Sequence, residues 1–325
     1  MNIAHNLERA ARHFPNKPAI LFEGGELSYR QLEEAVNRVA GGLATLGVEM
    51  GDRIALFLPN IPAFPIAYLA AQKLGAVVVS VNVMLTTGEL DTTGRQKGAV
   101  LSHGNVVSNL FTVNRYLRMA PADRILITTP LFHVAAQNVM MNSGLNVAAT
   151  LVLHRRFDVQ RCAAAIEEHK ITLMMGVPTI YIALLDARVG PEALSSVRLF
   201  KSAAATMPVE IARRWQETYG KTVYEGYGLT ETSPAATFNH EYEYRLGSVG
   251  TPVEMVEMRV VDAEDREVPP GTWGEVVFRG PNVMLGYWTA RPRPPRRCAT
   301  AGSTRVTSVT WMKTATSTWS IASRI

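Results

Sequence analysis

The order of short apolar runs and amphipathic segments is the feature that most restricts the fold of this chain. A run at 54–58 is followed by a helix-like segment at 62–73 and then by the β-branched stretch AVVVSVNV at 76–83. Parallel strands need a crossover of this kind between them, so the order predicts a parallel α/β sheet with helices layered on it. The alternation continues, with strands expected at 124–130, 149–154, 171–178, 196–204 and within 222–232, and helices at 159–170 and 208–220.

Two local signals mark the ends of elements. The segment Ser28–Gln31 has the pattern of a capping box, and apolar residues follow at helical spacing until Gly47. We therefore expect a helix that begins after Ser28 and ends before Gly47. Near the other end of the chain, the apolar stretches 258–262 and 274–280 flank a turn rich in proline and glycine, which predicts an antiparallel hairpin.

The net charge of +5 overstates how basic most of the chain is. From Thr289 onward the sequence contains six arginines, one lysine and no acidic residue. The remainder has 26 basic against 28 acidic residues, so the basic character belongs to the tail. This distribution argues against a nucleic-acid-binding surface, and we expect no nucleic-acid partner.

Cysteine usage and hydropathy indicate a cytoplasmic protein. Cys162 and Cys298 stand far apart and have neither metal-ligand nor disulfide spacing, which fits a reducing compartment. The N-terminus carries charges throughout, unlike a secretory signal. The uncharged stretches 54–72 and 125–153 are interrupted by prolines or polar residues, so we expect no transmembrane segment, whereas peripheral membrane contact stays open.

A loop of small and hydroxylated residues stands in the stretch DTTGRQKGAVLSHGN (91–105). Its glycines allow backbone N–H groups to approach an anion closely, and its threonines and lysine add hydroxyl donors and a positive charge. The spacing differs from that of the nucleotide-binding P-loop, and a solvated surface turn is the simpler alternative. The residues of interest are Thr92, Thr93, Gly94, Lys97 and Gly98.

Together with four further segments, this loop resembles the adenylate-forming (AMP-binding) superfamily, which includes acyl-CoA synthetases, luciferase-like enzymes and peptide-synthetase adenylation domains. The segments stand in the family's order and are PLFH (130–133), KSAAATMP (201–208), YEGYGLTE (224–231) and GEVVFRGPNVMLGYW (274–288). The resemblance covers residues 1–288 and is strongest to long- and medium-chain fatty acyl-CoA synthetases. It implies an α/β fold of the large N-terminal-domain type, with layered αβ sheets and a small β subdomain.

The resemblance assigns a role to each segment. It implies that the glycine loop closes on the β- and γ-phosphates of ATP. It also implies that Tyr227 stacks on adenine, that Thr230 binds the α-phosphate and that Glu231 holds Mg²⁺. The candidate catalytic residues are Thr230, Glu231, Lys97 and His133, and the candidate nucleotide-binding residues are Thr92, Thr93, Gly94, Lys97, Gly98, Ser202, Ala203, Ala204, Glu225, Gly226, Tyr227, Gly228 and Thr230.

Several of these assignments have a simpler structural alternative. Thr230 and Glu231 could cap the N-terminus of a helix, and His133 could be a packed core residue as readily as a gate beside the acyl site. Family members often carry glycine where this chain has alanine at 203–205, a departure that would tighten the pocket. Arg279 could be a surface residue only.

Two places depart from the family pattern. A helix-like start at 85–90 runs straight into the glycine loop, where relatives have further helices and strands and begin the loop with Ser-Gly in place of Leu90-Asp91. We therefore expect material to be missing at 90/91, with strand edges and apolar surface exposed and a carboxylate placed beside the phosphate site.

The second departure follows residue 288. The family pattern continues there into D-G-W-x-x-T-G-D and a C-terminal domain with a lysine that contacts the reacting phosphate. Here, 289–325 is rich in Thr, Ser and Arg, and we expect a disordered, non-native tail. Because the tail can encode the expected motif when read one base out of register, we hypothesise a frameshift.

These features predict a fatty acyl-CoA ligase. Such an enzyme uses ATP and Mg²⁺ to adenylate a carboxylate and then transfers the acyl group to coenzyme A. The two departures lead us to expect an impaired or inactive fragment. The alternatives are a non-catalytic nucleotide- or acyl-binding protein, a pseudogene product, and an enzyme that adenylates aryl or other carboxylic acids.

Overall fold

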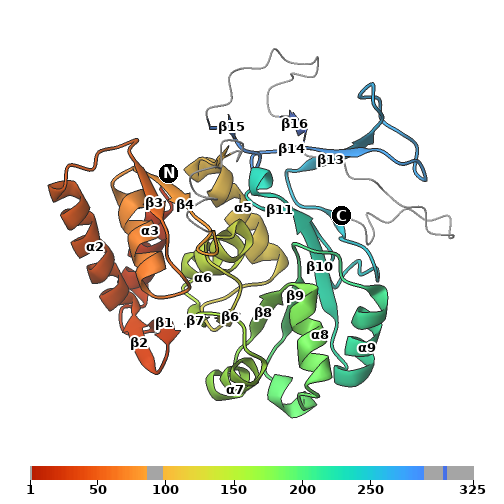
Figure 1. Ribbon diagram of the computed structural model, residues 1–325, viewed down its shortest axis with the longest axis horizontal. Helices are drawn as coiled ribbons and strands as arrows, with labels where there is room; N and C mark the ends of the chain where they lie inside the picture. Colours follow the sequence, from red (N-terminus) through yellow and green to blue (C-terminus); the bar gives the residue numbers. More distant parts are fainter. Residues whose placement is uncertain (1, 86–97, 289–302, 306–325) are drawn as a thin grey trace. The chain divides into compact units, whose positions relative to one another are not determined.

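The structure, a computed structural model, describes residues 2–85, 98–288 and 303–305 (Figure 1). The chain divides into two compact units. Unit 1 consists of Met1–Gln96, Leu117–Met175 and Val189–Arg198, and unit 2 of Lys97–Tyr116, Gly176–Arg188 and Leu199–Ile325. Among the described residues, no helix is both long and apolar enough to cross a membrane.

The main sheet of unit 1 has the predicted parallel core. Its strands lie in the order β8-β6-β7-β1-β2, and β6, β7, β8 and β1 pair in parallel, whereas β1 and β2 form an antiparallel hairpin. Every residue of β7 and β8 is buried, as expected for parallel strands covered on both faces. The bounds are β1 Pro18–Phe22, β2 Gly25–Ser28, β6 Arg124–Ile127, β7 Thr150–Leu153 and β8 Leu173–Gly176.

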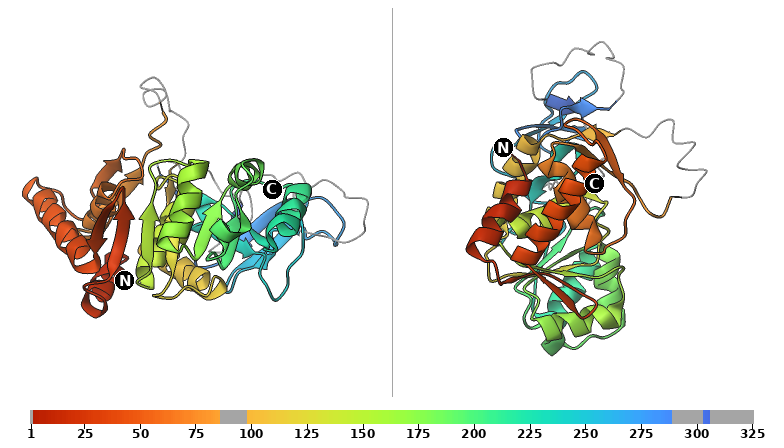
Figure 2. Two further views of the ribbon diagram at one scale, coloured as in Figure 1. Left: turned by 90° about the horizontal axis from the view of Figure 1, so that it is seen from below. Right: turned by 90° about the vertical axis from the view of Figure 1, so that its left-hand side faces the viewer.

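Helices α1 (Ala4–His13), α2 (Tyr29–Thr45) and α3 (Ala63–Lys73) of unit 1 pack against one another (Figure 2). The predicted capping box starts α2, because the Ser28 hydroxyl accepts from Gln31 N at 3.2 Å and Gln31 Oε1 accepts from Ser28 N at 2.8 Å. Gly47 follows the helix end with a φ of +85°. The other helices in the described part of unit 1 are a π-helix at Ala135–Asn142, α6 (Ser143–Asn146), α7 (Val159–His169) and a 3₁₀ turn at Pro191–Leu194.

A second, two-stranded sheet in unit 1 has one bare apolar face. Strands β3 (Arg53–Leu56) and β4 (Val77–Ser80) pair in parallel, and α3 packs against both. On the other face, Val77 and Val79 are 40% and 45% exposed. Within the described residues, these strands pair only with each other. Parallel strands are normally covered on both faces, so the exposure of these two valines is unusual. The 90/91 junction, where we expect material to be missing, lies outside the described residues.

Unit 2 is built around a four-stranded segment with the order β12-β11-β10-β9. Strands β9 and β10 are parallel, whereas β10, β11 and β12 pair antiparallel. Trp215 of α9 packs edge-on against Tyr181 of α8 and Phe200 of β9, with ring centroids 5.0 Å apart in both pairs. The bounds are β9 Leu199–Ser202, β10 Val223–Gly228, β11 Ala235–Phe238, β12 Thr251–Pro252, α5 His103–Tyr116, α8 Pro178–Asp186 and α9 Val209–Tyr219.

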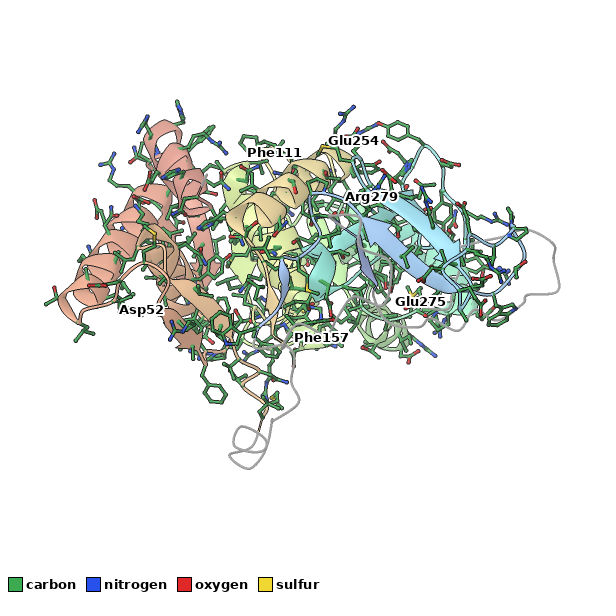
Figure 3. The ribbon with its side chains drawn as sticks, turned by 90° about the horizontal axis from the view of Figure 1, so that it is seen from above. Asp52, Phe111, Phe157, Glu254, Glu275 and Arg279 are labelled. Carbon is green, nitrogen blue, oxygen red and sulfur yellow. The ribbon has the colours of Figure 1, made fainter. Side chains whose placement is uncertain are left out.

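The predicted hairpin is confirmed as β13 (Glu257–Val261) and β14 (Glu275–Arg279). Glu275 and Arg279 stand at the two ends of β14 (Figure 3), and the Arg279 guanidinium pairs with Glu257 at 2.6 Å on the surface. Strand β16 (Ser303–Arg305) pairs with β14, so the expectation of disorder throughout 289–325 is wrong for these three residues. The reason is that β14 offers an open edge, whose backbone groups gain partners when a strand is added.

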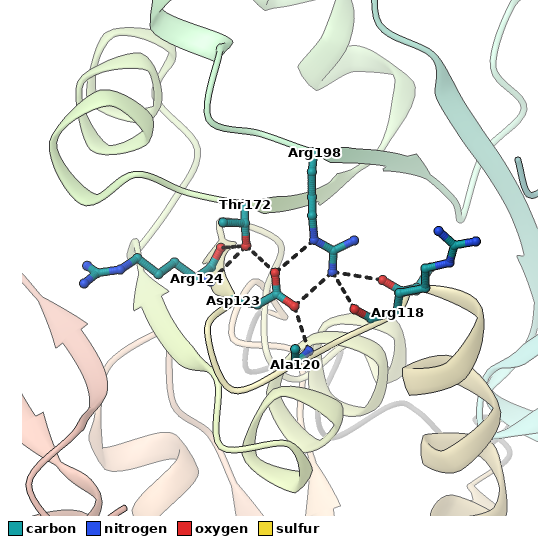
Figure 4. A network of polar contacts seen from close by, with 7 residues as sticks. Arg118, Ala120, Asp123, Arg124, Thr172 and Arg198 are labelled. Atoms are coloured by element: carbon teal, nitrogen blue, oxygen red, sulfur yellow. Dashed lines mark hydrogen bonds and ion pairs between the residues drawn. The ribbon is translucent and has the colours of Figure 1, made fainter.

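A buried carboxylate joins the N-terminal ends of β6 and β8 in unit 1 (Figure 4). Asp123 Oδ1 accepts from Arg198 Nε at 3.0 Å and from the Thr172 hydroxyl at 2.7 Å. Oδ2 accepts from Arg198 Nη2 at 2.9 Å and from Ala120 N at 2.8 Å. Although burial opposes it, these donors hold the pKa of Asp123 below its usual value. The carboxylate therefore stays ionised at neutral pH and stabilises the sheet.

We expect Asp123→Asn to lower the free energy of unfolding by about 3 kcal/mol at pH 7, because it breaks a buried, hydrogen-bonded ion pair. The native stability contributed by Asp123 is present above the ordinary aspartate pKa and is lost as the pH falls through its lowered folded pKa. The difference between variant and wild type should therefore shrink in acid. Urea titrations at pH 7 and pH 3 measure this. Asp186→Asn, which removes an exposed pair with Arg214, is the control; equal losses in both variants would contradict the prediction.

Candidate functional site

The structure places the described candidate residues in both units. Thr92, Thr93, Gly94 and Lys97 lie outside the described residues. His133 belongs to unit 1. The others all belong to unit 2, namely Gly98, Ser202, Ala203, Ala204, Glu225, Gly226, Tyr227, Gly228, Thr230 and Glu231.

The glycines of YEGYGLTE are required by close packing. A Cβ at Gly228 would lie 1.7 Å from Pro234 O, and one at Gly226 would lie 2.9 Å from Lys201 Nζ. The chain therefore reverses tightly after β10, and Leu229 N donates to Pro234 O at 3.1 Å. This packing shapes the loop that carries Thr230 and Glu231.

Tyr227 and Thr230 present polar groups on this loop. The Tyr227 ring lies 6.0 Å from that of Phe278, and burial raises its pKa to about 12, so its hydroxyl stays protonated. Thr230 is exposed and begins a 3₁₀ turn at Thr230–Thr232. Thr232, not Thr230, accepts a hydrogen bond from Leu229 N, at 3.0 Å. The threonine that caps this turn is therefore Thr232, and the Thr230 hydroxyl takes no part in the cap.

Glu231 is anchored from both its backbone and its side chain. Its carbonyl accepts from Met284 N at 2.8 Å, and its Oε1 accepts from the Tyr287 hydroxyl at 2.6 Å. Burial, followed by the hydrogen bond to Glu231, raises the pKa of Tyr287 to about 12, so Tyr287 is the donor. Within the described residues, Glu231 has no cationic partner among the ion pairs.

This donor set fits Mg²⁺ bound together with a phosphate. Among the described residues, no group of three His, Cys, Asp or Glu side chains could form a metal cage. Mg²⁺ usually takes one or two protein carboxylates and completes its shell with phosphate oxygens and water. Glu231, with Oε1 held by Tyr287, offers one such carboxylate.

The end of the glycine loop lies beside this carboxylate. Strand β5 (Ala99–Val100) follows Gly98 directly and pairs antiparallel with β15 (Gly286–Tyr287), with Ala99 opposite Tyr287. Trp288 N donates to Gly98 O at 2.7 Å. The pairing of β5 with β15 therefore joins Gly98, the residue next to Lys97, to the strand that carries the hydroxyl bound to Glu231. That Lys97 itself reaches the same phosphate remains a prediction.

Three buried asparagines, which the sequence analysis did not identify, hold these loops in place. Asn105 Nδ2 donates to Pro281 O and Val283 O, both at 2.8 Å, and Asn109 Nδ2 donates to Ala235 O at 2.7 Å. Asn282 Nδ2 donates to Thr232 O at 2.9 Å. A signal was present, because Asn105 and Asn109 stand four residues apart and therefore share one face of α5.

The small-residue run begins in a buried strand and ends in a strained turn. Ser202 is fully buried, and its hydroxyl has no hydrogen-bond partner in the described part of the chain. Ala204 has a φ of +67°, in the left-handed region that costs an L-residue roughly 1–2 kcal/mol. The glycine that family members often carry in this run suits such a backbone, which gives the alanine departure a physical meaning.

The sequence analysis also did not identify Lys201, whose amino group is fully buried beside Glu225. Its Nζ donates to Glu225 O at 3.2 Å and lies 3.8 Å from the centre of the Phe238 ring. Burial lowers the pKa of Lys201 to about 7 and raises that of Glu225 to about 7. The Glu225 side chain accepts a hydrogen bond from Met207 N at 3.2 Å. This side chain therefore contacts the protein interior.

His133 follows β6 in unit 1 and is exposed, so the packed-core alternative is wrong for it. Its Nδ1 accepts from Ala135 N at 3.2 Å, and desolvation of the ring lowers its pKa. The imidazole is therefore neutral at pH 7 and keeps Nε2 as its N–H donor.

A cleft in unit 1 is lined by other residues of the described chain. It has a volume of about 740 Å³ and contains none of the candidate residues. Glu23 and Arg155 form an ion pair on its wall, with Nε 2.7 Å from Oε1. The side chains that line this cleft carry charges of both signs. We assign the candidate site to unit 2, which contains most of the described candidate residues.

Comparison with known proteins identifies the family. The family model described as AMP-binding enzyme matches residues 7–91 and 92–288. The chain belongs to this AMP-binding family. Feruloyl-CoA synthase of Amycolatopsis sp is 32% identical to it over 346 positions, which cover 86% of this chain and 70% of that protein. The long-chain-fatty-acid–CoA ligase of Salmonella typhimurium is 27% identical over 392 positions, with the same coverage of 86% and 70%.

A solved member of the AMP-binding family has the same fold. ATP-bound MatB from Rhodopseudomonas palustris matches with a TM-score of 0.79 at 28% identity, over 89% of this chain and 72% of that chain. These findings confirm the α/β fold class and the resemblance to acyl-CoA synthetases. By family, the chain is an acid–thiol ligase.

We expect Lys201→Met to raise the free energy of unfolding by about 1–4 kcal/mol at pH 6, because burial lowers the pKa of Lys201 and its charged form therefore costs stability, whereas methionine keeps the packing against Phe238. The folded pKa of Lys201, about 7, lies below the model value of 10.5, so the cost of its charge is fully present below pH 7 and disappears above 10.5. The gain should therefore be smaller at pH 10. Thermal melts at both pH values test this, with the exposed Lys170→Met as control. Equal losses of stability at both pH values would sink the idea.

Proposed function

We propose that this chain binds ATP·Mg²⁺ and activates a carboxylic acid by adenylation. The carboxylate attacks the α-phosphorus of ATP, forms acyl-AMP and expels pyrophosphate; the thiol of coenzyme A then displaces AMP. The observation that carries this proposal is the link between the glycine-loop end and Glu231, made by β5, β15 and the Tyr287–Glu231 hydrogen bond. The AMP-binding family match supports it.

The proposed roles follow the positions of the groups. Tyr227 stacks on adenine, Thr230 donates its exposed hydroxyl to the α-phosphate, and the backbone around Ser202 borders the nucleotide. Glu231 holds Mg²⁺, which when bound neutralises phosphate charge. The loop residues Thr92, Thr93, Gly94, Lys97 and Gly98 bind the outer phosphates. Because the acid is already ionised at neutral pH, alignment and charge neutralisation contribute most of the catalysis.

A fatty acid is the substrate that we propose first. The long-chain-fatty-acid–CoA ligase of Salmonella typhimurium supports it. An aryl acid is the second candidate, favoured by the higher identity, 32%, to feruloyl-CoA synthase. The neutral His133 is proposed as a positioning group for the acyl chain in either case. Use of ATP and coenzyme A, together with a free Cys162, supports a cytoplasmic location.

We further propose that turnover is impaired by the junction at Leu90-Asp91. The alignment with feruloyl-CoA synthase has 346 positions, more than the 325 residues of this chain, so that relative has residues without a counterpart here. The family match divides between 91 and 92, and β4, which carries the exposed Val77 and Val79, ends at Ser80, ten residues before Leu90. A carboxylate at Asp91 repels the phosphates that the next residues bind.

The activity is tested with three measurements on the chain. Calorimetry should detect ATP binding in the presence of Mg²⁺. Exchange of pyrophosphate into ATP and thioester formation with palmitate or ferulate should be weaker than in an intact relative by about 10²–10³-fold or more. No ATP binding would reject the proposed function. Normal thioester turnover would reject the impairment, and ferulate outperforming palmitate would select the aryl-acid alternative. Binding without exchange would mark a non-catalytic nucleotide-binding protein.

We expect the double substitution Leu90→Ser and Asp91→Gly to tighten ATP·Mg²⁺ binding on the order of tenfold, because it removes one negative charge close to the triphosphate. The measurement is titration calorimetry at two salt concentrations, since the gain should fall as salt screens the charge. Asp265→Gly removes an acidic residue from the β13–β14 hairpin at a φ of +67°, where glycine fits, and serves as control. An equal gain in the control would show a general charge effect instead.

A further inference from the structure

We propose that Tyr287 is a positioning residue that orients the Glu231 carboxylate for Mg²⁺ and is coupled through β5 to Gly98. The proposal rests on the function proposed above and adds a residue to it. It starts from a single contact, in which the Tyr287 hydroxyl donates to Glu231 Oε1 at 2.6 Å. A hydrogen bond to an ionised acceptor at this distance is short and strong. It restricts rotation of the carboxylate and leaves Oε2 to face a cation.

The backbone on both sides of Tyr287 is held by strand pairing. Leu285 N donates to Val100 O at 2.9 Å, and Trp288 N donates to Gly98 O at 2.7 Å. Between them, Gly286 and Tyr287 lie opposite Val100 and Ala99. The hydroxyl therefore cannot leave Glu231 by a simple shift of its strand unless these backbone bonds break.

The segment 284–288 also forms a hydrogen bond with the backbone of Glu231. Met284 N donates to Glu231 O at 2.8 Å, so Glu231 is attached at its main chain and at its side chain to residues three apart. Asn105 Nδ2 fixes the start of the segment through Pro281 O and Val283 O. Two polar contacts at one residue specify its orientation much more closely than one contact would.

Coupling follows from where β5 lies in the sequence. Gly98 is the last residue of the phosphate-binding motif, and the strand that follows it carries the partner of Tyr287. The pairing of β5 with β15 therefore links Gly98 to the strand that carries the hydroxyl bound to Glu231. A partner that orients a metal-binding carboxylate typically contributes 10–100-fold to metal affinity.

The test uses Tyr287→Phe, which keeps the ring and removes only the hydroxyl. Mn²⁺, observed by electron paramagnetic resonance, replaces Mg²⁺ as the probe and is titrated into the chain saturated with ATP. We expect the variant to bind Mn²⁺ about tenfold or more weakly. Its affinity for ATP without metal should equal that of the wild type, and a cooperative thermal melt should show that it is folded even though it loses one hydrogen bond. Tyr242→Phe, at a residue that is 74% exposed, is the matched control and should change nothing.

A double substitution separates positioning from packing. In a Glu231→Gln background, Tyr287→Phe should produce no further loss of Mn²⁺ affinity, because its effect passes through the carboxylate. A loss of the same size in both backgrounds would overturn the proposal, and so would unchanged Mn²⁺ affinity in the single variant. If the wild type fails to bind ATP, the proposed function itself fails, which is a different result from a wild type that binds ATP and a variant that behaves identically.

A measurement on the wild type keeps the proposal testable if the variant does not fold. Hydrogen exchange of the amides of 284–288 should slow when ATP·Mg²⁺ is added and should change little with ATP alone. Equal protection in both states would contradict the coupling. The amides of β13, which belong to the same unit, provide the internal control.

Discussion

The antiparallel contact between β5 and β15 is the interaction on which the candidate site depends. It is only two residues long in each strand, yet it places the end of the glycine loop beside the residue that binds Glu231. A pairing this short is weak by itself, because few backbone bonds offset the entropy of ordering two chain segments. Its stability must come from the side chains that fix the adjoining segments.

Buried asparagines supply that fixation. Asn105, Asn109 and Asn282 each donate to backbone carbonyls in the loops and at the ends of the short elements around the site. An unpaired buried carbonyl is costly, so each amide both stabilises its loop and selects a single loop conformation. The site therefore has a rigid polar frame, and the groups proposed to contact ATP stand at its edge. This arrangement leaves Thr230 exposed and Glu231 half-buried.

Unit 1 contains two sheets whose strands differ in how far they are covered. Its main parallel sheet has strands buried on both faces, whereas β3 and β4 are covered by α3 on one side only. Relatives have residues that this chain lacks, and the family match divides between 91 and 92. We propose that the bare face of β3 and β4 and the impaired turnover have one origin, which is the sequence departure at the 90/91 junction.

The sequence by itself determined the parallel α/β core, the capping box at Ser28, the β13–β14 hairpin and the family, because these depend on local periodicity and on motifs a few residues long. It did not identify Lys201, Tyr287 or the three asparagines. Their significance arises from partners 24 to 178 residues away, as in the bonds of Lys201 to Glu225 and Asn105 to Val283. Only the tertiary structure decided these contacts, because side chains distant in sequence acquire shared environments through packing. Strand β16 shows the same limit, since its partner is an edge that no local pattern reveals.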